Sequence, residues 1–161
     1  MPDWSHLDDK QLIGAYCTLM AVLKERGIVR SANNPVADYT EALVCKALRL
    51  VQETSQSQAG YDAIDPANGR RYQIKGRRLT SHNSSTQLSA LRNLRERPFD
   101  LLAAVTYSEN MGVLYAALIP LDAVLELSRY SAHTNSHTLM FRRNLLDDPR
   151  ATDITDELRA V

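Results

Sequence analysis

The stretch "GYDAIDPANGRRYQIKGRR", residues 60–78, decides the fold that we expect for this chain. Its Asn68-Gly69 pair favours a tight hairpin turn, because both residue types adopt the positive φ angles of primed turns at little cost. Residues able to form strands lie on both sides of the pair. We therefore predict two short antiparallel strands, Tyr61–Asp65 and Arg71–Lys75, and a positive φ at Gly69.

A two-residue turn also fixes the register of this hairpin. Asp62 is then expected opposite Lys75, and opposed side chains share a face of the sheet. Side chains alternate along each strand, so Gln73 lies on the same face as Asp62 and Lys75. Asp65 points to the other face and is interpreted as a turn residue. A one-residue slip of the register would exchange the two aspartates.

Two helices are predicted before the hairpin. Apolar residues recur at helical spacing over Leu12–Leu23, and Ser5 with Asp8 forms a plausible capping box ahead of them. Asn34 followed by proline combines a cap residue with proline at the first helical position. The second helix is therefore expected from Pro35 to about Gln52.

Further elements are predicted after the hairpin. A helix begins at Ser85 or Thr86 and runs through Leu94. The apolar runs "FDLLAAVTY" and "VLYAALIP" form a second hairpin, a short helix lies near Asp122–Tyr130, and "TLMF" forms a late strand. This order predicts an α/β (α+β) fold with a mixed central sheet flanked by helices and preceded by an N-terminal helix.

Length and composition place the chain among ordinary globular proteins. Its 161 residues, 44% of them apolar and 24% charged, suit one domain, with an N-terminal helix (1–30), a core (34–119) and a C-terminal region ending in an acidic tail (120–161). No apolar run approaches the ~20 residues that a membrane helix needs. Cys17 and Cys45 are interpreted as buried thiols in a reducing compartment, and we expect a cytoplasmic protein.

Charge is distributed unevenly although the formal net charge is zero. Between Pro66 and Pro98 a single acid, Glu96, faces eight bases: Arg70, Arg71, Lys75, Arg77, Arg78, Arg92, Arg95 and Arg97. A basic working face for nucleic acid would produce this distribution, and so would solvated helix faces. Both interpretations remain open at this point.

Glu41 supplies a second carboxylate at the border of the apolar stripe of the second helix. It is either an ordinary boundary glutamate or a group that points along the sheet instead of into water. Two carboxylates, the amide of Gln73 and the ammonium of Lys75 are suitable for phosphodiester hydrolysis. Carboxylates hold Mg²⁺, the ion activates a water, and the ammonium neutralises developing charge.

The order of these residues resembles the PD-(D/E)XK nuclease superfamily. In that pattern a helical glutamate is followed by an aspartate on a hairpin and an acid-x-lysine on the next strand, here Glu41, Asp62 and Gln73-Ile74-Lys75. Gln73 stands where most members have an acid, as in the Q-x-K variant of the Mrr-like branch. The resemblance covers roughly residues 34–119 and implies a restriction-endonuclease-like core.

The resemblance also implies the roles of the site residues. Glu41, Asp62 and the carbonyl of Ile74 would bind Mg²⁺ or Mn²⁺, and Lys75 would be the catalytic lysine beside Gln73. The substrate would be DNA, and a homodimer would suit two cuts on a duplex. Contacts to phosphates are expected from eight residues in the basic segment: Arg70, Arg71, Arg77, Arg78, Asn83, Ser85, Gln87 and Arg92.

Two other functional hypotheses remain open. The first is a DNA-binding or partner-binding protein that retains this fold without metal chemistry, which the neutral Gln73 favours. The second is an unrelated α+β domain in which "QIKGRR" is an edge strand with solvated charges. A zinc site at His133 and His137 has no evident third ligand, and Cys17 lies among apolar residues of a helix, which disfavours a nucleophile.

Overall fold

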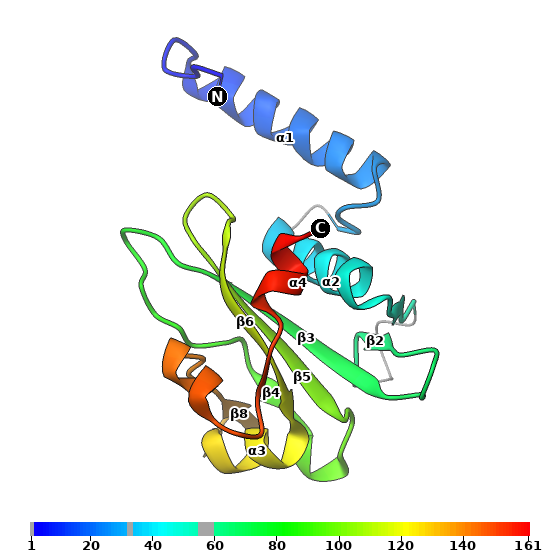
Figure 1. Ribbon diagram of the computed structural model, residues 1–161. Coiled ribbons are helices and arrows are strands. Elements are labelled where there is room, and N and C mark those ends of the chain that lie inside the picture. Colours follow the sequence, from blue (N-terminus) through cyan, green and yellow to red (C-terminus); the bar gives the residue numbers. More distant parts are fainter. Residues whose placement is uncertain (1, 32–33, 55–59) are drawn as a thin grey trace.

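The computed structural model describes residues 2–31, 34–54 and 60–161, and a mixed six-stranded sheet forms its centre (Figure 1). β3 runs parallel to β5, and the other neighbouring strands are antiparallel. This sheet, flanked by helices and preceded by an N-terminal helix, confirms the predicted fold class. In spatial order its strands are β1 (Val51–Gln52), β2 (Ala63–Ile64), β3 (Arg71–Arg78), β5 (Leu101–Tyr107), β6 (Val113–Pro120) and β9 (Thr152–Asp153).

The remaining elements surround this sheet. Its helices are α1 (Asp9–Glu25), α2 (Pro35–Leu48), α3 (Leu121–Leu127) and α4 (Thr155–Arg159), with two short 3-10 helices, η1 (Leu94–Glu96) and η2 (Arg143–Asp147). A small antiparallel sheet has the order β4 (Leu91–Arg92), β8 (Ser136–Thr138) and β7 (Arg129–Ser131). No helix in the described ranges is long and apolar enough to span a bilayer.

The first face of the central sheet packs against α2 and α4. One apolar cluster joins the helices to the sheet on this face. It contains Leu43 and Val44 of α2, Leu158 of α4, and every second residue of the strands, including Ile74, Ala103 and Val105. β5 is buried on both faces, which is why its sequence is a continuous apolar run. The predicted hairpin of β5 and β6 is confirmed.

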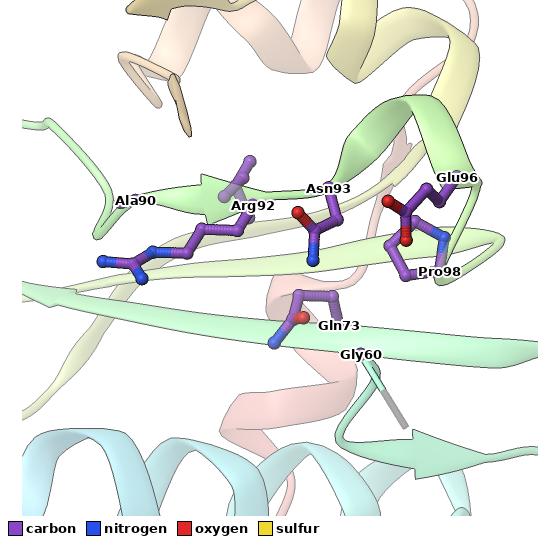
Figure 2. Close-up of a pocket in the computed structure, with 8 residues that line it drawn as sticks. Gly60, Gln73, Ala90, Arg92, Asn93, Glu96 and Pro98 are labelled. Carbon is purple, nitrogen blue, oxygen red and sulfur yellow. The ribbon is translucent and has the colours of Figure 1, made fainter. Parts of the chain in front are cut away.

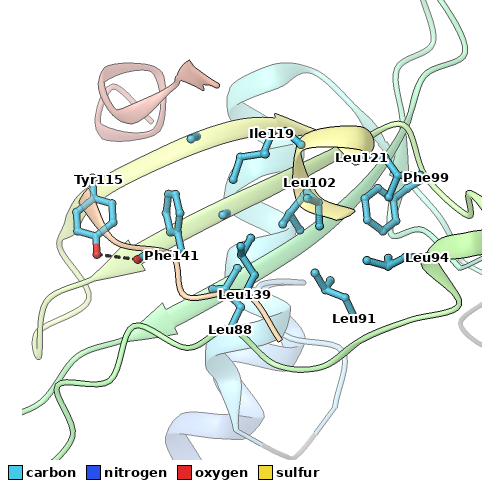
Figure 3. Packing of buried hydrophobic residues seen from close by; sticks show 14 residues of the cluster. Leu88, Leu91, Leu94, Phe99, Leu102, Tyr115, Ile119, Leu121, Leu139 and Phe141 are labelled. Atoms are coloured by element: carbon cyan, nitrogen blue, oxygen red, sulfur yellow. Dashed lines mark hydrogen bonds between the residues drawn. The ribbon is translucent and has the colours of Figure 1, made fainter. Parts of the chain in front are cut away.

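The second face packs against the segment that links β3 to β5 and against residues near β8. Leu88, Leu91 and Leu94 of this segment lie against Leu102 and Ile119 of the sheet (Figure 3). In the parallel register Gln73 pairs with Leu102 and Lys75 with Ala104. Gln73 and Lys75 therefore point toward this second face, away from α2.

The helix predicted from Ser85 or Thr86 through Leu94 is wrong. Thr86 and Leu88 instead form backbone hydrogen bonds with Phe141 and Leu139, of 3.0 Å each. Only the short β4 and η1 follow. The leucines at three-residue intervals serve an extended chain that buries them against the sheet, and this burial overrides the helical interpretation.

The hairpin between β2 and β3 has a longer loop than predicted. Gly69 has a φ of 74°, as expected, but the loop closes with a 2.9 Å bond from the Asp65 amide to the Arg70 carbonyl. The carboxylate of Asp65 also accepts a bond from the Ala67 amide, at 2.8 Å. Ala63 consequently pairs with Tyr72, a shift of two residues from the predicted register. A shift of two keeps the residues of the strands on their faces. Asp62, in the bend just before β2, still contacts the side chain of Gln73.

The predicted helix boundaries are partly confirmed. Asn34 caps α2 and accepts a bond from the Val36 amide, as expected, but α2 ends at Leu48 because Arg49 adopts a left-handed conformation. Gln52, predicted to end this helix, belongs to β1. In α1 the capping box is formed by Asp8 and Gln11, three residues later than predicted.

Candidate functional site

Asp62 occupies the place where β2 and β3 begin to separate. Its amide donates to the Tyr72 carbonyl at 2.7 Å, and its Oδ2 accepts a bond of 2.7 Å from the Ile74 amide. The side-chain amide of Gln73 donates to the same oxygen. Asp62 thus replaces a backbone acceptor with a carboxylate and is fixed by two donors of β3.

Glu41 reaches this region from α2, on the first face of the sheet. Its Oε2 accepts bonds from the guanidinium of Arg30 and from Nε2 of Gln52, the latter at 3.0 Å. Only 13% of its side chain is exposed. Glu41 therefore does not project into solvent.

The charge of Asp62 acts on the carboxyl group of Glu41. Burial raises the pKa of Glu41, the negative charge of Asp62 raises it further, and Arg30 and Gln52 oppose both effects. The thiol of Cys45, on the next turn of α2, responds to the same charges: burial, followed by Glu41 and Asp62, raises its pKa to about 11. A buried thiol with so high a pKa remains protonated at neutral pH and is unsuited to nucleophilic catalysis.

Each carboxylate holds its position with one oxygen and leaves the other available. Among the residues that the structure describes, neither Oε1 of Glu41 nor Oδ1 of Asp62 has a hydrogen-bond partner. One or two carboxylates, completed by waters and substrate phosphates, are the protein ligands that Mg²⁺ commonly takes. The donor set therefore fits Mg²⁺, although the described ranges contain no group of three or more His, Cys, Asp or Glu side chains that could hold a metal by themselves.

Gln73 and Lys75 extend the site along β3 on the second face. Lys75 is half-buried, and its ammonium has no hydrogen-bond or ion-pair partner within the described ranges. Its charge is therefore not neutralised by any described residue. Asp62, Gln73 and Lys75 thus line one side of β3, and Glu41 approaches the same edge from the other.

A cleft of about 370 Å³ opens over Gln73. Figure 2 shows Gln73 on the side of β3 that faces Asn93 and Arg92, and Gly60 and Pro98 also line the cleft. Arg92 is exposed and supplies positive charge to the cleft. Of the eight residues predicted to contact DNA, Arg92 is the one that lines this cleft together with Gln73.

The other predicted DNA contacts lie elsewhere or serve the fold. Arg71 forms a bidentate pair with Asp100, which offsets its charge. Arg77 binds the Ser85 carbonyl and the side chain of Asn83, so these three residues hold the loop after β3 together. Arg78 donates to the Glu109 carbonyl, Gln87 forms an isolated bridge with Met140, and Arg70 is exposed in the hairpin loop. The basic segment is therefore spread over several surfaces.

Arg30 and Gln52 were not predicted as site residues. Arg30 lies in the connection between α1 and α2, and its guanidinium also donates to the Glu53 carbonyl at 3.3 Å. No sequence motif identifies Arg30 as a site residue, because its role comes from its contact with Glu41, 11 residues later in the chain. Gln52 was assigned to the helix, whereas a strand position beside Asp62 would have suggested contact with Glu41.

The alternative sites find no support in the geometry. His137 is buried in β8 and bonds to the Ser128 hydroxyl at 3.0 Å, while His133 is exposed in the preceding turn. Both cysteines are free, with Cys17 exposed on α1 against the prediction of burial. Within the described ranges β2 pairs with β3 at Arg71 and Tyr72, so residues 73–78 have a ladder partner on the β5 side alone, and this half of β3 lies at an edge of the sheet. No family model matches the chain, and no curated protein is similar to it in sequence.

Proposed function

We propose that the protein is a metal-dependent nuclease that hydrolyses phosphodiester bonds in DNA, with a Q-x-K version of the PD-(D/E)XK pattern. One observation carries the proposal. The negative charge of Asp62 raises the pKa of Glu41, a carboxyl from a distant segment, and each carboxylate keeps one oxygen without a partner in the described ranges. Mutual repulsion between such carboxylates is unfavourable by itself and is relieved by a bound cation.

The site residues would divide the work as follows. Glu41 and Asp62 would hold Mg²⁺ or Mn²⁺, with the Ile74 carbonyl as a further oxygen ligand. The ion, when bound, would polarise the scissile phosphate and lower the pKa of a water. Gln73 orients Asp62 through its amide, and Lys75 offers its ammonium to charge that develops on the phosphate.

The surroundings of these residues suit this chemistry. Arg92 would hold a phosphate oxygen at the mouth of the cleft, where a guanidinium can form two parallel bonds. Arg30 lies against Glu41 and favours its ionised form, which is the form that binds metal. Two free thiols suit a reducing compartment, so we place the activity in the cytoplasm. Cleavage of both strands of a duplex would suit a homodimer.

A DNA-binding protein without catalysis is the second candidate. The observation that favours it is the amide of Gln73, which donates to Asp62 where an acid would provide a further metal ligand. In that case the wild-type protein would bind DNA through the basic residues and would cleave none of it.

Cleavage of plasmid DNA and labelled oligonucleotides in Mg²⁺ or Mn²⁺ separates the two candidates. Lys75→Ala is expected to reduce the rate by about 10²–10³, as is typical when one electrostatic stabiliser is removed. Lys46→Ala, on the exposed side of α2, is the matched control and should cleave like the wild type. Gln73→Glu should tighten Mg²⁺ binding in calorimetric titrations and preserve or raise activity.

The contrary results are equally distinct. An inactive wild type with cleavage gained by Gln73→Glu would identify the second candidate. If the wild type and both variants bind DNA equally and none cleaves it with any divalent metal, catalysis is refuted and only binding remains.

A further inference from the structure

The apolar face of α1 remains largely uncovered by the rest of the chain. Leu12, Ile13, Tyr16 and Leu19 are exposed at 39%, 65%, 49% and 57%, and Met20 is the only residue of the helix that is buried. In Figure 1, α1 extends away from the sheet, and its C-terminal end lies nearer to α2 than its N-terminal end does. Apolar groups gathered on one face of a helix normally pack against a partner.

The sequence of α1 shows what kind of partner fits. Leu12, Tyr16, Leu19 and Leu23 are separated by four, three and four residues, which is the spacing of a coiled-coil seam. The same spacing continues to a charge at each end, with Asp9 three residues before Leu12 and Arg26 three residues after Leu23. Neither charged side chain has an ion-pair partner within the described ranges.

This pattern is complementary to itself when two helices run antiparallel. Leu12 then faces Leu23 of a second copy, Tyr16 faces Leu19, and Asp9 faces Arg26 at both ends of the seam. A parallel pair would instead oppose Asp9 to Asp9 and Arg26 to Arg26, and it would align the two helix dipoles unfavourably. The charges therefore select the antiparallel arrangement, which has the twofold symmetry of a closed dimer.

A groove beside α1 provides a place for the partner helix. It has a volume of about 420 Å³ and lies between Tyr16 and Leu23 of α1 and the first residues of α2, with Val29, Val36 and Tyr39 among its apolar lining. The antiparallel register brings Leu12 of the partner opposite Leu23, at this groove. Each copy would thus fill the groove of the other.

We propose that α1 is the dimerisation element of this protein, pairing antiparallel with α1 of a second copy through the seam Leu12, Tyr16, Leu19 and Leu23. The proposal depends on α1 and its groove alone. It holds whether or not the protein cleaves DNA.

Light scattering coupled to gel filtration, with the full chain at about 1–100 μM, tests the dimer. The wild type should have twice the 18.1 kDa mass of the monomer at the upper concentrations. Leu19→Asp places a carboxylate in the seam and should weaken dimerisation at least tenfold, with an unchanged circular dichroism spectrum because Leu19 is exposed. Ala21→Asp introduces the same charge on the exposed opposite face and should leave the dimer intact.

Charge reversal tests the direction of the helices. Asp9→Lys or Arg26→Glu alone should weaken an antiparallel dimer, and the double variant should recover it because opposite charges face each other again. Both single changes oppose the helix dipole, so recovery in the double variant cannot come from a more stable helix. Equal dimerisation of all charge variants would refute the antiparallel register. A monomer at every concentration would overturn the proposal and would leave a lipid surface or a different protein as the occupant of this face.

Discussion

Replacing Gly76 by alanine is expected to destabilise the protein and to disturb the candidate site. A Cβ at this position would lie 2.1 Å from Oγ1 and 3.0 Å from Cβ of Thr40, on α2. Thr40 is fully buried, and its hydroxyl donates to the Val36 carbonyl at 2.6 Å, so it has little room to move. The absence of a side chain at Gly76 is therefore what permits α2 to approach β3 this closely.

The size of the effect follows from that contact. Extra methyl groups in packed interiors cost about 1–3 kcal/mol. For a chain of this length each kcal/mol lowers Tm by about 2–4 °C, so Gly76→Ala should lower it by about 2–12 °C. Glu41 follows Thr40 directly, so a displaced α2 would also carry Glu41 away from Asp62 and weaken Mg²⁺ binding.

Urea unfolding followed by circular dichroism measures the stability change. Thr40→Ala removes Oγ1 and Cγ2 but leaves the 3.0 Å contact, so the double variant should recover part of the loss, with a coupling of about 0.5–3 kcal/mol. Gly14→Ala is the matched control, because its Cβ would meet no atom within 4 Å and alanine favours the helix by up to about 1 kcal/mol. Additive effects of Gly76→Ala and Thr40→Ala would refute the packing argument.

Three further predictions concern the site. Because the pKa of Glu41 is raised, its contribution to stability falls as pH rises from the usual pKa of 4.5 through the raised pKa. Mg²⁺ binds the ionised carboxylate, so the increase in Tm caused by Mg²⁺ should be larger at about pH 7.5 than at about pH 4.5. An equal increase at both pH values in calorimetric scans would count against metal binding at Glu41. Asp62→Ala should lower the free energy of unfolding in urea by about 1–3 kcal/mol, because it leaves the Ile74 amide without its acceptor. Asp62→Asn should lower it less while still weakening Mg²⁺ binding. Equal losses of stability in the two variants would show that the hydrogen bond to the Ile74 amide contributes little. DNA affinity should fall as the salt concentration rises, and Arg92→Ala should reduce the slope of log affinity against log salt concentration by about 0.9. Arg142 lines a different groove, so Arg142→Ala should leave this slope unchanged. The same slope for both variants in fluorescence anisotropy titrations would exclude Arg92 from phosphate contact.

Local sequence signals predicted the central part of the fold well. The Asn68-Gly69 pair correctly indicated a hairpin, and the two apolar runs correctly indicated β5 and β6. The length of the first loop was not predictable in this way, because Asp65 stabilises the longer turn with its own side chain. Asp62 nevertheless lies beside Gln73, whose side-chain amide donates to its carboxylate.

Contacts between distant segments account for the failures. Residues 85–94 have helical spacing of leucines, but their backbone pairs with the chain around Leu139, some 50 positions away. Arg30 joins the site through a similar long-range contact with Glu41. Neither contact leaves a pattern in the neighbouring sequence, so both could be identified only from the folded structure.

The brevity of β1 and β2 has a consequence for how the protein moves. Each is paired over two residues, whereas β3, β5 and β6 are joined by ladders of seven. Local opening at this edge breaks few bonds, so the Ile74 amide, held by a side chain, should exchange its hydrogen with solvent sooner than the amides of β5. Asp62 can then swing away from β3 while the rest of the sheet stays closed, and a cation that bridges Asp62 and Glu41 would slow this exchange at one identifiable amide.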